Sequence, residues 1–341
     1  NEKTLISDLE KKLYKSVEQT MISDVPLGCF LSGGIDSSLI SAISQNISEK
    51  KIETFSIGFN ENEYDETLYA RKVSKILGTD HNECIIDTEK LFSIFDKIVD
   101  VYDEPFADSS QIPTILLSEF ARSKVKVALT GDGADELFGG YNRYIYTNKV
   151  SSFIRLLPLS LRKKFSRYFL SSSTSVYFFS KLFNLINFNE NKLPQIKDKI
   201  EKFSRIFANC NSNLEIFLTL LKVNRNELEN VSYYNSDIRS LFAEDVLNLL
   251  NDKNITDEQK MMKVDQIFYL NSDILHKVDR ASMSVGLETR VPFLSTDVYE
   301  YSRSLPNKYK FNRNLGKWIL RRLSEKYFPK EIFRRKKMGF S

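Results

Sequence analysis

The chain contains few of the residues that build metal centres and disulfide frameworks. Its 341 residues include two histidines, His81 and His276, and three cysteines, Cys29, Cys84 and Cys210, which are widely separated and form no CxxC pair. Two histidines are too few for a histidine-rich metal centre, and the cysteine spacing favours neither a zinc site nor a disulfide. We therefore expect structural histidines and buried, reduced thiols.

Long hydrophobic runs are also absent. No apolar stretch approaches the length of a membrane span, and the polar start at residues 1–4 lacks the apolar core of a secretory signal. Hydrophobic residues still make up 42% of the chain, which is enough for the core of one large domain or two. We therefore expect a soluble, cytoplasmic protein that does not bind a membrane.

Glycine is missing from a long central part of the chain. Nine of the twelve glycines lie at or before Gly140, and none lies between Tyr141 and Val285. Because close approach of the backbone to a phosphate favours glycine, we expect such turns in the first part only. Residues 151–260 show helical patterns rich in Lys, Asn, Phe and Leu and broken by prolines. We assign no chemistry to that segment.

The glycine-containing part alternates between two kinds of pattern. Apolar runs typical of strands lie at residues 27–31, 52–59, 82–86 and 125–129, and helical patterns such as 66–77 lie between them. This alternation predicts a right-handed, parallel α/β sheet. In such a sheet, ligands bind outside the carboxyl ends of the strands.

A first loop with phosphate-binding character follows the run 27–31. It consists of Ser32, Gly33, Gly34, Ile35, Asp36, Ser37 and Ser38. The glycines let backbone N–H groups approach oxygen atoms, the helix that begins near Ser37 offers its positive end, and Asp36 can hold a divalent cation. No Gly-Lys-Ser/Thr follows, so this is not a Walker loop. An ordinary strand–turn–helix with a serine cap is the alternative.

A second loop, residues 130–141, follows the run 125–129 and combines glycine with acidic residues. Its sequence is Thr-Gly-Asp-Gly-Ala-Asp-Glu-Leu-Phe-Gly-Gly-Tyr. The spacing does not give the alternating ligands of an EF-hand, which disfavours a calcium loop. Because both loops follow strands of one parallel sheet, we expect them at the same edge, where two acidic loops can share one Mg²⁺.

Further motifs follow in order at residues 103–110, 277–283, 287–294, 316–321 and 336–341. With the two loops, they resemble the synthetase domain of glutamine-dependent asparagine synthetases, which are N-type ATP pyrophosphatases with a PP-loop. The resemblance extends over residues from about 10 to 150 and from 265 to 341. It implies an α/β fold with a parallel sheet of the adenine-nucleotide alpha-hydrolase-like (PP-loop ATPase) type and a large, mainly helical C-terminal part.

The resemblance also implies an organisation in three parts. Residues 1–150 are expected to form the PP-loop ATP-binding core, residues 151–264 a divergent helical segment, and residues 265–341 a helical part that completes the synthetase site. The family's N-terminal glutaminase domain, which begins with a nucleophilic cysteine, is absent from this chain. Ammonia is expected from such a domain or as free ammonium, and a homodimer is left open.

The chemistry implied by the resemblance is the ATP-dependent amidation of a carboxylate, with ATP and Mg²⁺ as cofactors. The carboxylate attacks the α-phosphate, which gives an acyl-adenylate and pyrophosphate, and ammonia then displaces AMP. The implied site residues are Leu31, Ser32, Gly33, Gly34, Asp36, Ser37, Ser38, Ile57, Thr130 and Gly131 for ATP and pyrophosphate, Asp36 and Asp135 for Mg²⁺, and Lys317, Lys337 and Asp132 for catalysis.

The substrate is the most open of these expectations. Aspartate is the favoured acceptor, although residues 109–111, Ser-Ser-Gln, stand where some asparagine synthetases carry an arginine suited to clamp aspartate. Arg280 or Arg290 is expected to take over that clamp. The alternatives are the amidation of a sugar carboxylate in polysaccharide synthesis and the closure of a β-lactam ring without ammonia.

Positive charge is concentrated near the end of the chain. Between Lys308 and Lys337 there are twelve Lys and Arg residues and two acidic residues. Such a cluster is also found in nucleic-acid-binding proteins, and an RNA-modifying PP-loop protein is a remote alternative. We favour a few cations that face ATP and a solvated helix face for the rest, so nucleic acid is the disfavoured partner.

Overall fold

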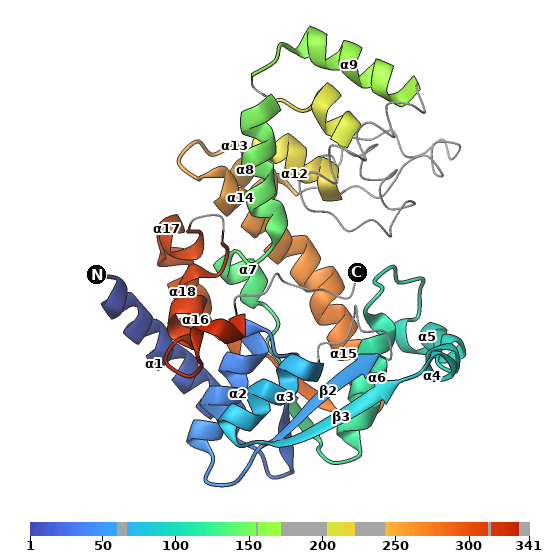
Figure 1. Cartoon of the computed structure of the whole chain (residues 1–341), viewed down its shortest axis with the longest axis vertical. Coiled ribbons are helices and arrows are strands. Elements are labelled where there is room, and N and C mark those ends of the chain that lie inside the picture. Colours follow the sequence, from blue (N-terminus) through green and yellow to red (C-terminus); the bar gives the residue numbers. More distant parts are fainter. Residues whose placement is uncertain (60–66, 155, 172–202, 222–242, 313–314, 334–341) are drawn as a thin grey trace. The chain divides into compact units, whose positions relative to one another are not determined.

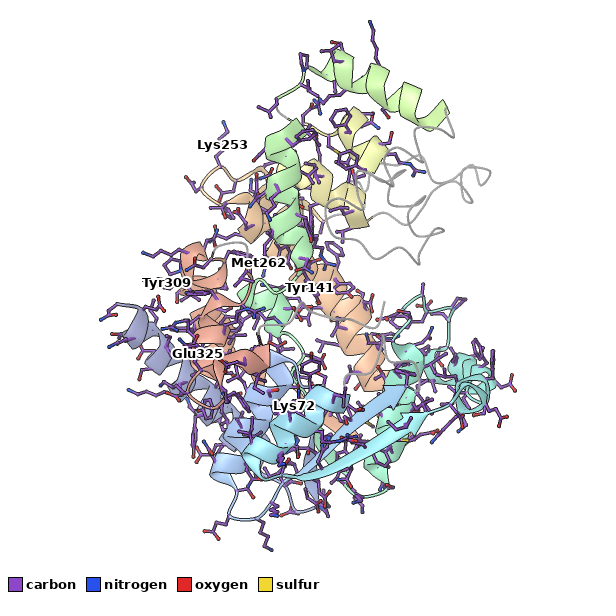
Figure 2. The ribbon with its side chains drawn as sticks, viewed as in Figure 1. Lys72, Tyr141, Lys253, Met262, Tyr309 and Glu325 are labelled. Atoms are coloured by element: carbon purple, nitrogen blue, oxygen red, sulfur yellow. The ribbon has the colours of Figure 1, made fainter. Side chains whose placement is uncertain are left out.

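The computed structural model describes residues 1–59, 67–154, 156–171, 203–221, 243–312 and 315–333. The chain divides into two compact units, one made of residues 1–140 and 263–341 and the other of residues 141–262. Tyr141 and Met262, the first and last residues of the second unit, are labelled in Figure 2. Both glycine loops belong to the first unit.

A five-stranded parallel sheet forms the centre of the first unit. In spatial order its strands are β3 (Asp80–Ile86), β2 (Glu53–Phe59), β1 (Leu27–Phe30), β4 (Val127–Leu129) and β5 (Glu288–Arg290). The predicted parallel α/β sheet is therefore confirmed. The sequence pattern does not predict β5, because a three-residue segment with a charged residue at each end shows no apolar run.

The strand order places a topological switch point between β1 and β4. From β1 the chain moves outward to β2 and β3, and it then returns to the other side of β1 to form β4. Cys29 in β1 lies opposite Thr54 in β2 and Leu129 in β4. Connections that leave neighbouring strands in opposite directions open a crevice at their carboxyl ends. The two glycine loops follow β1 and β4, so both begin at this crevice.

Helices cover both faces of the sheet (Figure 1). One face packs against α1 (Glu2–Thr20), α2 (Ile35–Ile47), α3 (Thr67–Leu77) and α18 (Trp318–Ser324), and the other against α6 (Gln111–Arg122) and α15 (His276–Met283). The remaining elements of this unit are α4 (Thr88–Phe92), α5 (Phe95–Tyr102), α7 (Ala134–Phe138), the π-helix η3 (Asp265–Leu275), η4 (Pro292–Leu294), α16 (Thr296–Ser304), α17 (Asn307–Lys310) and η5 (Lys330–Phe333).

The apolar residues of α1 show why this helix lies against the sheet. Ile6, Leu9, Leu13 and Val17 are buried at helical spacing, and the side chain of Asn1 caps the helix by accepting a hydrogen bond from the Lys3 N–H. These four residues share one core cluster with β1 and α2. The same cluster contains Ile35 of the first glycine loop, so that loop is anchored on this core.

The described part of the second unit is helical. It contains α8 (Asn142–Ile154), α9 (Leu159–Ser171), α12 (Asn213–Leu221) and α13 (Glu244–Asn251). Helix α14 (Asp257–Val264) begins in the second unit and ends in the first, because the boundary along the chain follows Met262. Ile154, Ile206, Phe207 and Ile216 form its core together with Cys210. Burying this cluster supplies the hydrophobic stabilisation that short helices need.

None of the helices in the described ranges combines the length and the apolar character needed to cross a membrane. All three cysteines are free, with Cys29 and Cys210 buried and Cys84 half-buried. Burial raises the pKa of the Cys29 thiol to about 11, so this thiol stays protonated at neutral pH. The expected burial is present at Cys29 and Cys210, whereas Cys84 is less covered than predicted.

Candidate functional site

The first loop turns directly from β1 into α2. The helix begins at Ile35 with Gly34 as its N-cap, two residues earlier than the sequence analysis places it. Asp36 and Ser37 therefore lie in the first helical turn, where the dipole favours negative charge nearby. The Ser37 hydroxyl lies 3.0 Å from the Ser32 hydroxyl and accepts a hydrogen bond from the Ser32 N–H at 3.2 Å. These contacts hold the loop closed over the helix end.

The second loop touches the first through Gly131. A Cβ atom built on Gly131 would stand 2.7 Å from the backbone nitrogen of Ser37 and 3.0 Å from the carbonyl carbon of Asp36. Any larger residue would push the two loops apart. The predicted convergence of the loops at one edge of the sheet is therefore present in the structure.

Lys317 joins the two loops. Its Nζ lies 2.5 Å from an Asp36 carboxylate oxygen and 2.8 Å from an Asp135 carboxylate oxygen. The Lys317 side chain is 6% exposed, so the three charges are largely shielded from water. From the sequence alone, these residues are expected at neighbouring sites, the two carboxylates at Mg²⁺ and the lysine at the phosphates. The structure brings them together as one lysine between two carboxylates.

Lys317 reaches this place because the backbone around it is unusual. It has φ 54° and ψ 35°, one of two non-glycine residues with positive φ in the described part of the chain. Its side chain passes over Gly140, where a Cβ atom would stand 2.1 Å from Lys317 Cε. Residues in this left-handed region are strained by about 1–3 kcal/mol and are concentrated at functional sites. Gly139 and Gly140 are part of the second loop, and nothing local in the sequence indicates that this pair makes room for a lysine.

The electrostatics of this group favour a positive charge between the carboxylates. Burial by itself would lower the pKa of Lys317, but Asp135 and Asp36 outweigh it and the pKa is raised above its ordinary value. Mg²⁺ is usually held by one or two carboxylates together with substrate phosphates. The described residues contain no cluster of three or more His, Cys, Asp or Glu side chains that would form a cage for a metal. The donor set therefore fits Mg²⁺ shared with a phosphate.

Asp132 belongs to the second loop, and charges of both loops and of Lys277 act on its carboxyl group. Burial raises the pKa of its carboxyl group, and the negative charges of Asp135 and Asp36 act in the same direction. The positive charge that opposes this shift belongs to Lys277. Sequence reasoning missed Lys277.

Lys277 on α15 contacts the segment before α6. Its Nζ lies 2.5 Å from an Asp108 carboxylate oxygen and donates to the Ser110 hydroxyl at 2.6 Å. Burial acts to raise the pKa of Asp108, but hydrogen bonds from Asp273, Lys277 and Ser110 and the charge of Lys277 lower it to about 2. The two arginines predicted to clamp aspartate have partners within the protein. Arg290 donates to the carbonyls of Thr20 and Ile22, and Arg280 pairs with Asp103 at the surface.

The remaining predicted residues differ in their exposure. Leu31 and Ile57 are buried in two different core clusters, and Thr130 and Ser38 are also buried. The Ser38 hydroxyl is therefore beneath the loop surface, whereas Gly34 is half-buried and Gly33 is buried with φ 71°. Lys337 lies outside the described residues.

Arg321 supports the lysine loop from α18. Its Nε donates to the Gly316 carbonyl and its Nη1 to the Phe333 carbonyl, each at 3.0 Å. Burial lowers the pKa of the guanidinium, and the nearby Asp36 opposes this effect. Arg321 therefore fixes the residue before Lys317. Arg321 is the last residue of the motif at 316–321, and nothing local in the sequence indicates this supporting role.

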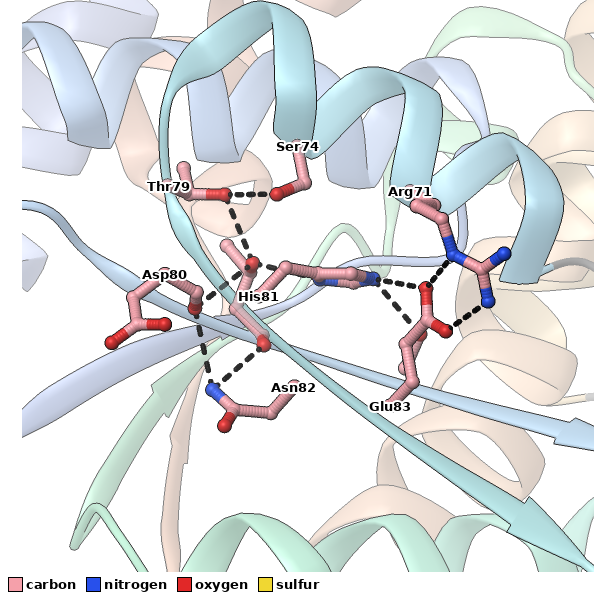
Figure 3. A network of polar contacts seen from close by, with 9 residues as sticks. Arg71, Ser74, Thr79, Asp80, His81, Asn82 and Glu83 are labelled. Carbon is pink, nitrogen blue, oxygen red and sulfur yellow. Dashed lines mark hydrogen bonds and ion pairs between the residues drawn. The ribbon is translucent and has the colours of Figure 1, made fainter.

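His81 belongs to a separate network, shown in Figure 3. Its Nδ1 lies 2.9 Å from the Thr54 hydroxyl and its Nε2 lies 3.1 Å from Glu83, which also accepts from Arg71. Burial lowers the pKa of His81 in spite of Glu83. The network ties the edge strand β3 to β2 and α3, so this histidine is structural, as predicted.

A parallel sheet with two contacting glycine loops at its switch point places this chain in the PP-loop class of α/β proteins. The family model described as asparagine synthase matches residues 8–341. The chain therefore belongs to the asparagine synthase family.

Three relatives illustrate the range of similarity. Glutamine-hydrolyzing asparagine synthetase 1 of Bacillus subtilis is 32% identical over 339 residues, which are 99% of this chain and 50% of that protein. A putative glutamine-hydrolyzing asparagine synthetase 2 of Methanocaldococcus jannaschii is 44% identical over 48% of this chain and 31% of its own length. The amidase chyE of Penicillium rubens is 29% identical over 42% of this chain and 24% of its own length. The chain thus spans about half the length of the Bacillus relative.

Proposed function

We propose that this chain performs the synthetase half-reactions of an enzyme that converts aspartate into asparagine. ATP is cleaved to AMP and pyrophosphate in the process. The observation that carries the proposal is the contact of Lys317 with both Asp36 and Asp135, because it collects one cation and two carboxylates where two phosphate-type loops meet. The names of the Bacillus and Methanocaldococcus relatives support the same reaction.

In the first step the substrate carboxylate attacks the α-phosphate of ATP, which brings two anions together. The backbone N–H groups at the start of α2 and the hydroxyls of Ser32 and Ser37 are suited to bind the departing pyrophosphate. Asp36 and Asp135 would hold Mg²⁺, which supplies charge neutralisation and orientation when bound. Lys317 then turns its ammonium from the carboxylates towards the phosphate oxygens. Lys337 is proposed as a second cation for this step.

In the second step ammonia attacks the acyl carbon and AMP leaves. The attacking nitrogen must lose a proton, so a base is needed beside the acyl group. Asp132 suits this role because burial raises the pKa of its carboxyl group, which makes it a better proton acceptor than an ordinary aspartate. Backbone atoms at Leu31, Thr130 and Gly131, which lie at or beside the loops, are proposed to border the adenosine, together with Ile57 of the neighbouring strand β2.

The bond at which ATP is cleaved tests this function. With aspartate, Mg²⁺ and ammonium, the complete protein should release AMP and pyrophosphate in equal amounts. Release of ADP and phosphate instead would overturn the adenylation mechanism. Ammonium is used so that the result does not depend on a glutaminase.

Two substitutions test the metal assignment. Asp36→Asn and Asp135→Asn should each reduce pyrophosphate release by about 10²–10³-fold, a loss typical for groups that stabilise developing charge. Asp103→Asn is the matched control, because Asp103 also pairs with a cation, Arg280, but at the surface. Normal turnover in both loop variants would make the Mg²⁺ assignment wrong.

A further inference from the structure

Phe311 lies with its ring against Gly139, the residue that ends α7. A Cβ atom built on Gly139 would stand 2.3 Å from Phe311 Cζ, 2.5 Å from its Cε1 and 3.0 Å from its Cε2. Gly139 has φ 72° and ψ 49°, the left-handed conformation that glycine commonly adopts at the end of a helix. The ring therefore occupies the space that a side chain at this position would need.

The segment that begins at Phe311 touches the end of α7 at a second point. A Cβ atom built on Gly316 would stand 2.1 Å from the Gly139 carbonyl oxygen. The N–H of Lys317 donates to the carbonyl of Phe138 at 3.2 Å. The two ends of this segment, Phe311 and Lys317, thus both rest on the last residues of α7 and its glycine cap.

Backbone hydrogen bonds couple the two ends of the segment. Asn312 and Leu315 exchange two N–H to carbonyl bonds of 3.0 and 2.8 Å. Phe311 donates its N–H to the Asn307 carbonyl of α17 at 2.8 Å. Helix α18, which begins directly after Lys317, packs against both α7 and α17 (Figure 1). A displacement of the ring is therefore passed along the segment towards the start of α18.

The segment matters to the proposed reaction because it ends at Lys317. Lys317 Nζ contacts Asp36 of the first loop and Asp135, which lies in the first turn of α7. This helix is only five residues long, and Gly139 ends it. The distance between Lys317 and Asp135 is therefore set by how the segment is seated on α7. Phe311 acts on this distance from the other end of the helix, through Gly139.

We infer that Phe311 is a positioning residue for the proposed adenylation: its ring, seated on Gly139, keeps the ammonium of Lys317 at the place where the pyrophosphate oxygens develop charge. This inference rests on the proposed function and adds to it a residue that acts through another. A misplacement of about 1 Å in such a group can reduce a rate about 100-fold. An apolar ring suits the role, because it holds its place by close packing and offers no charge that competes for Lys317.

The test measures pyrophosphate release by the complete protein with aspartate, ATP, Mg²⁺ and ammonium. Phe311→Ala should lower kcat about 10–100-fold and change KM for ATP by less than about threefold, since the backbone N–H groups of the first loop stay in place. Phe311→Leu keeps apolar bulk over Gly139 and should retain kcat within about threefold. Thermal unfolding reports whether each variant is folded. If the alanine variant does not fold, Phe311→Val takes its place, because valine readily adopts the extended backbone of this position (φ −123°, ψ 126°).

A second substitution separates positioning from general support of the fold. Gly140→Ala displaces Lys317 directly, because the added carbon would stand 2.1 Å from its Cε. In that background Phe311→Ala should lower kcat by less than about threefold, since the group that the ring positions is already out of place. A purely structural role gives the same factor in both backgrounds.

Phe120→Ala is the matched control, because it removes the same ring from another half-buried site. The ring of Phe120 packs edge-on against that of Phe55, with 5.8 Å between the centroids, in the core cluster that contains Ala121 and Val125. This variant should lower the temperature of unfolding and leave kcat unchanged.

Three outcomes would overturn the inference. If Phe311→Ala, or Phe311→Val in its place, keeps kcat within about threefold of the wild type, the ring is dispensable. An equal loss of kcat in the wild-type and Gly140→Ala backgrounds would make the ring purely structural. Both outcomes leave the proposed function intact, because the wild type still releases pyrophosphate. Absence of pyrophosphate release from the wild type would overturn the proposed function itself and this inference with it.

Discussion

Lys317 and Gly140 fit each other without spare room. A single carbon added to Gly140 would stand 2.1 Å from Lys317 Cε and 1.9 Å from the Asp135 oxygen that Lys317 contacts. The absence of a side chain at Gly140 therefore makes room for the contact between Lys317 and Asp135.

Gly140→Ala should reduce pyrophosphate release by about 100-fold or more, because Lys317 and Asp135 would both have to move and a displacement of about 1 Å can have this effect. Circular dichroism should show an intact fold. Gly78→Ala is the control, since no atom lies within 4 Å of the added carbon there; its φ of 71° costs some stability, but the substitution crowds no neighbour. It should keep full activity. Full activity in Gly140→Ala would mean that the lysine contact is dispensable.

Lys317→Gly should be more stable than Lys317→Ala by about 1 kcal/mol, which reverses the usual order of the two residues. The reason is the φ of 54° at this position, which glycine adopts without strain. Urea unfolding of the two variants measures the difference. If the alanine variant is equally stable or more stable, the positive φ is not a feature of the folded protein. Both variants should lose adenylation.

Asp108 should make stability depend on acid pH. Its pKa is about 2 in the folded protein and near 3.9 in the unfolded chain, so the unfolded chain takes up the proton first. The stabilisation is present above about pH 4 and is lost as the pH falls towards 2, with about 1 kcal/mol lost between pH 5 and pH 3. In Asp108→Asn this part of the loss should be absent.

The measurement is urea unfolding at pH 5 and pH 3 for both proteins. Asp297→Asn serves as the control, because the lowered pKa of Asp297 comes from an exposed pair with Lys15 that water and salt screen. An equal pH dependence in the wild type and Asp108→Asn would contradict the assigned pairing.

Arg321→Gln should lower the free energy of unfolding by about 1–3 kcal/mol and pyrophosphate release by about tenfold, because it removes two charge-assisted hydrogen bonds, one to Gly316 just before Lys317 and one to Phe333. The neighbouring Arg322→Gln removes the same charge, but its partners are the part-exposed Glu2 and Glu325. It should change stability by less than about 1 kcal/mol and leave activity intact. If both variants lose stability and activity to a similar extent, the loss comes from the removed positive charge and not from the hydrogen bonds of Arg321.

The two loops could be predicted because their signal is local. An apolar run followed by glycine, serine and acid determines the turn and the helix start within a few residues, so the sheet edge and the position of Asp36 and Asp135 follow from the sequence. β5 could not be predicted in this way. Three residues stabilised by pairing with β4 have no periodicity of their own.

The lysines show why site geometry is harder to predict than fold. Lys277 and Arg280 are both basic residues of α15, but Lys277 lies on the same helix face as the buried Ala281, and Arg280 lies about 100° away from it. That relation to Ala281 is the signal that would have favoured Lys277 over Arg280. For Lys317, nothing local indicates a positive φ, because the opposing glycine is far away in the sequence.

Strands β4 and β5 are neighbours in the sheet, but β5 is synthesised much later than β4. Val127 in β4 pairs with Glu288 in β5, and the whole of residues 141–262 is translated between them. Until Arg290 has left the ribosome, β4 has an unpaired edge that can recruit strands from other chains. Lys317 arrives later still, so Asp36 and Asp135 first meet without their cation. The contact of Lys317 with both loops therefore requires the last part of the chain, and a chain truncated before β5 would expose the edge of β4 without this contact.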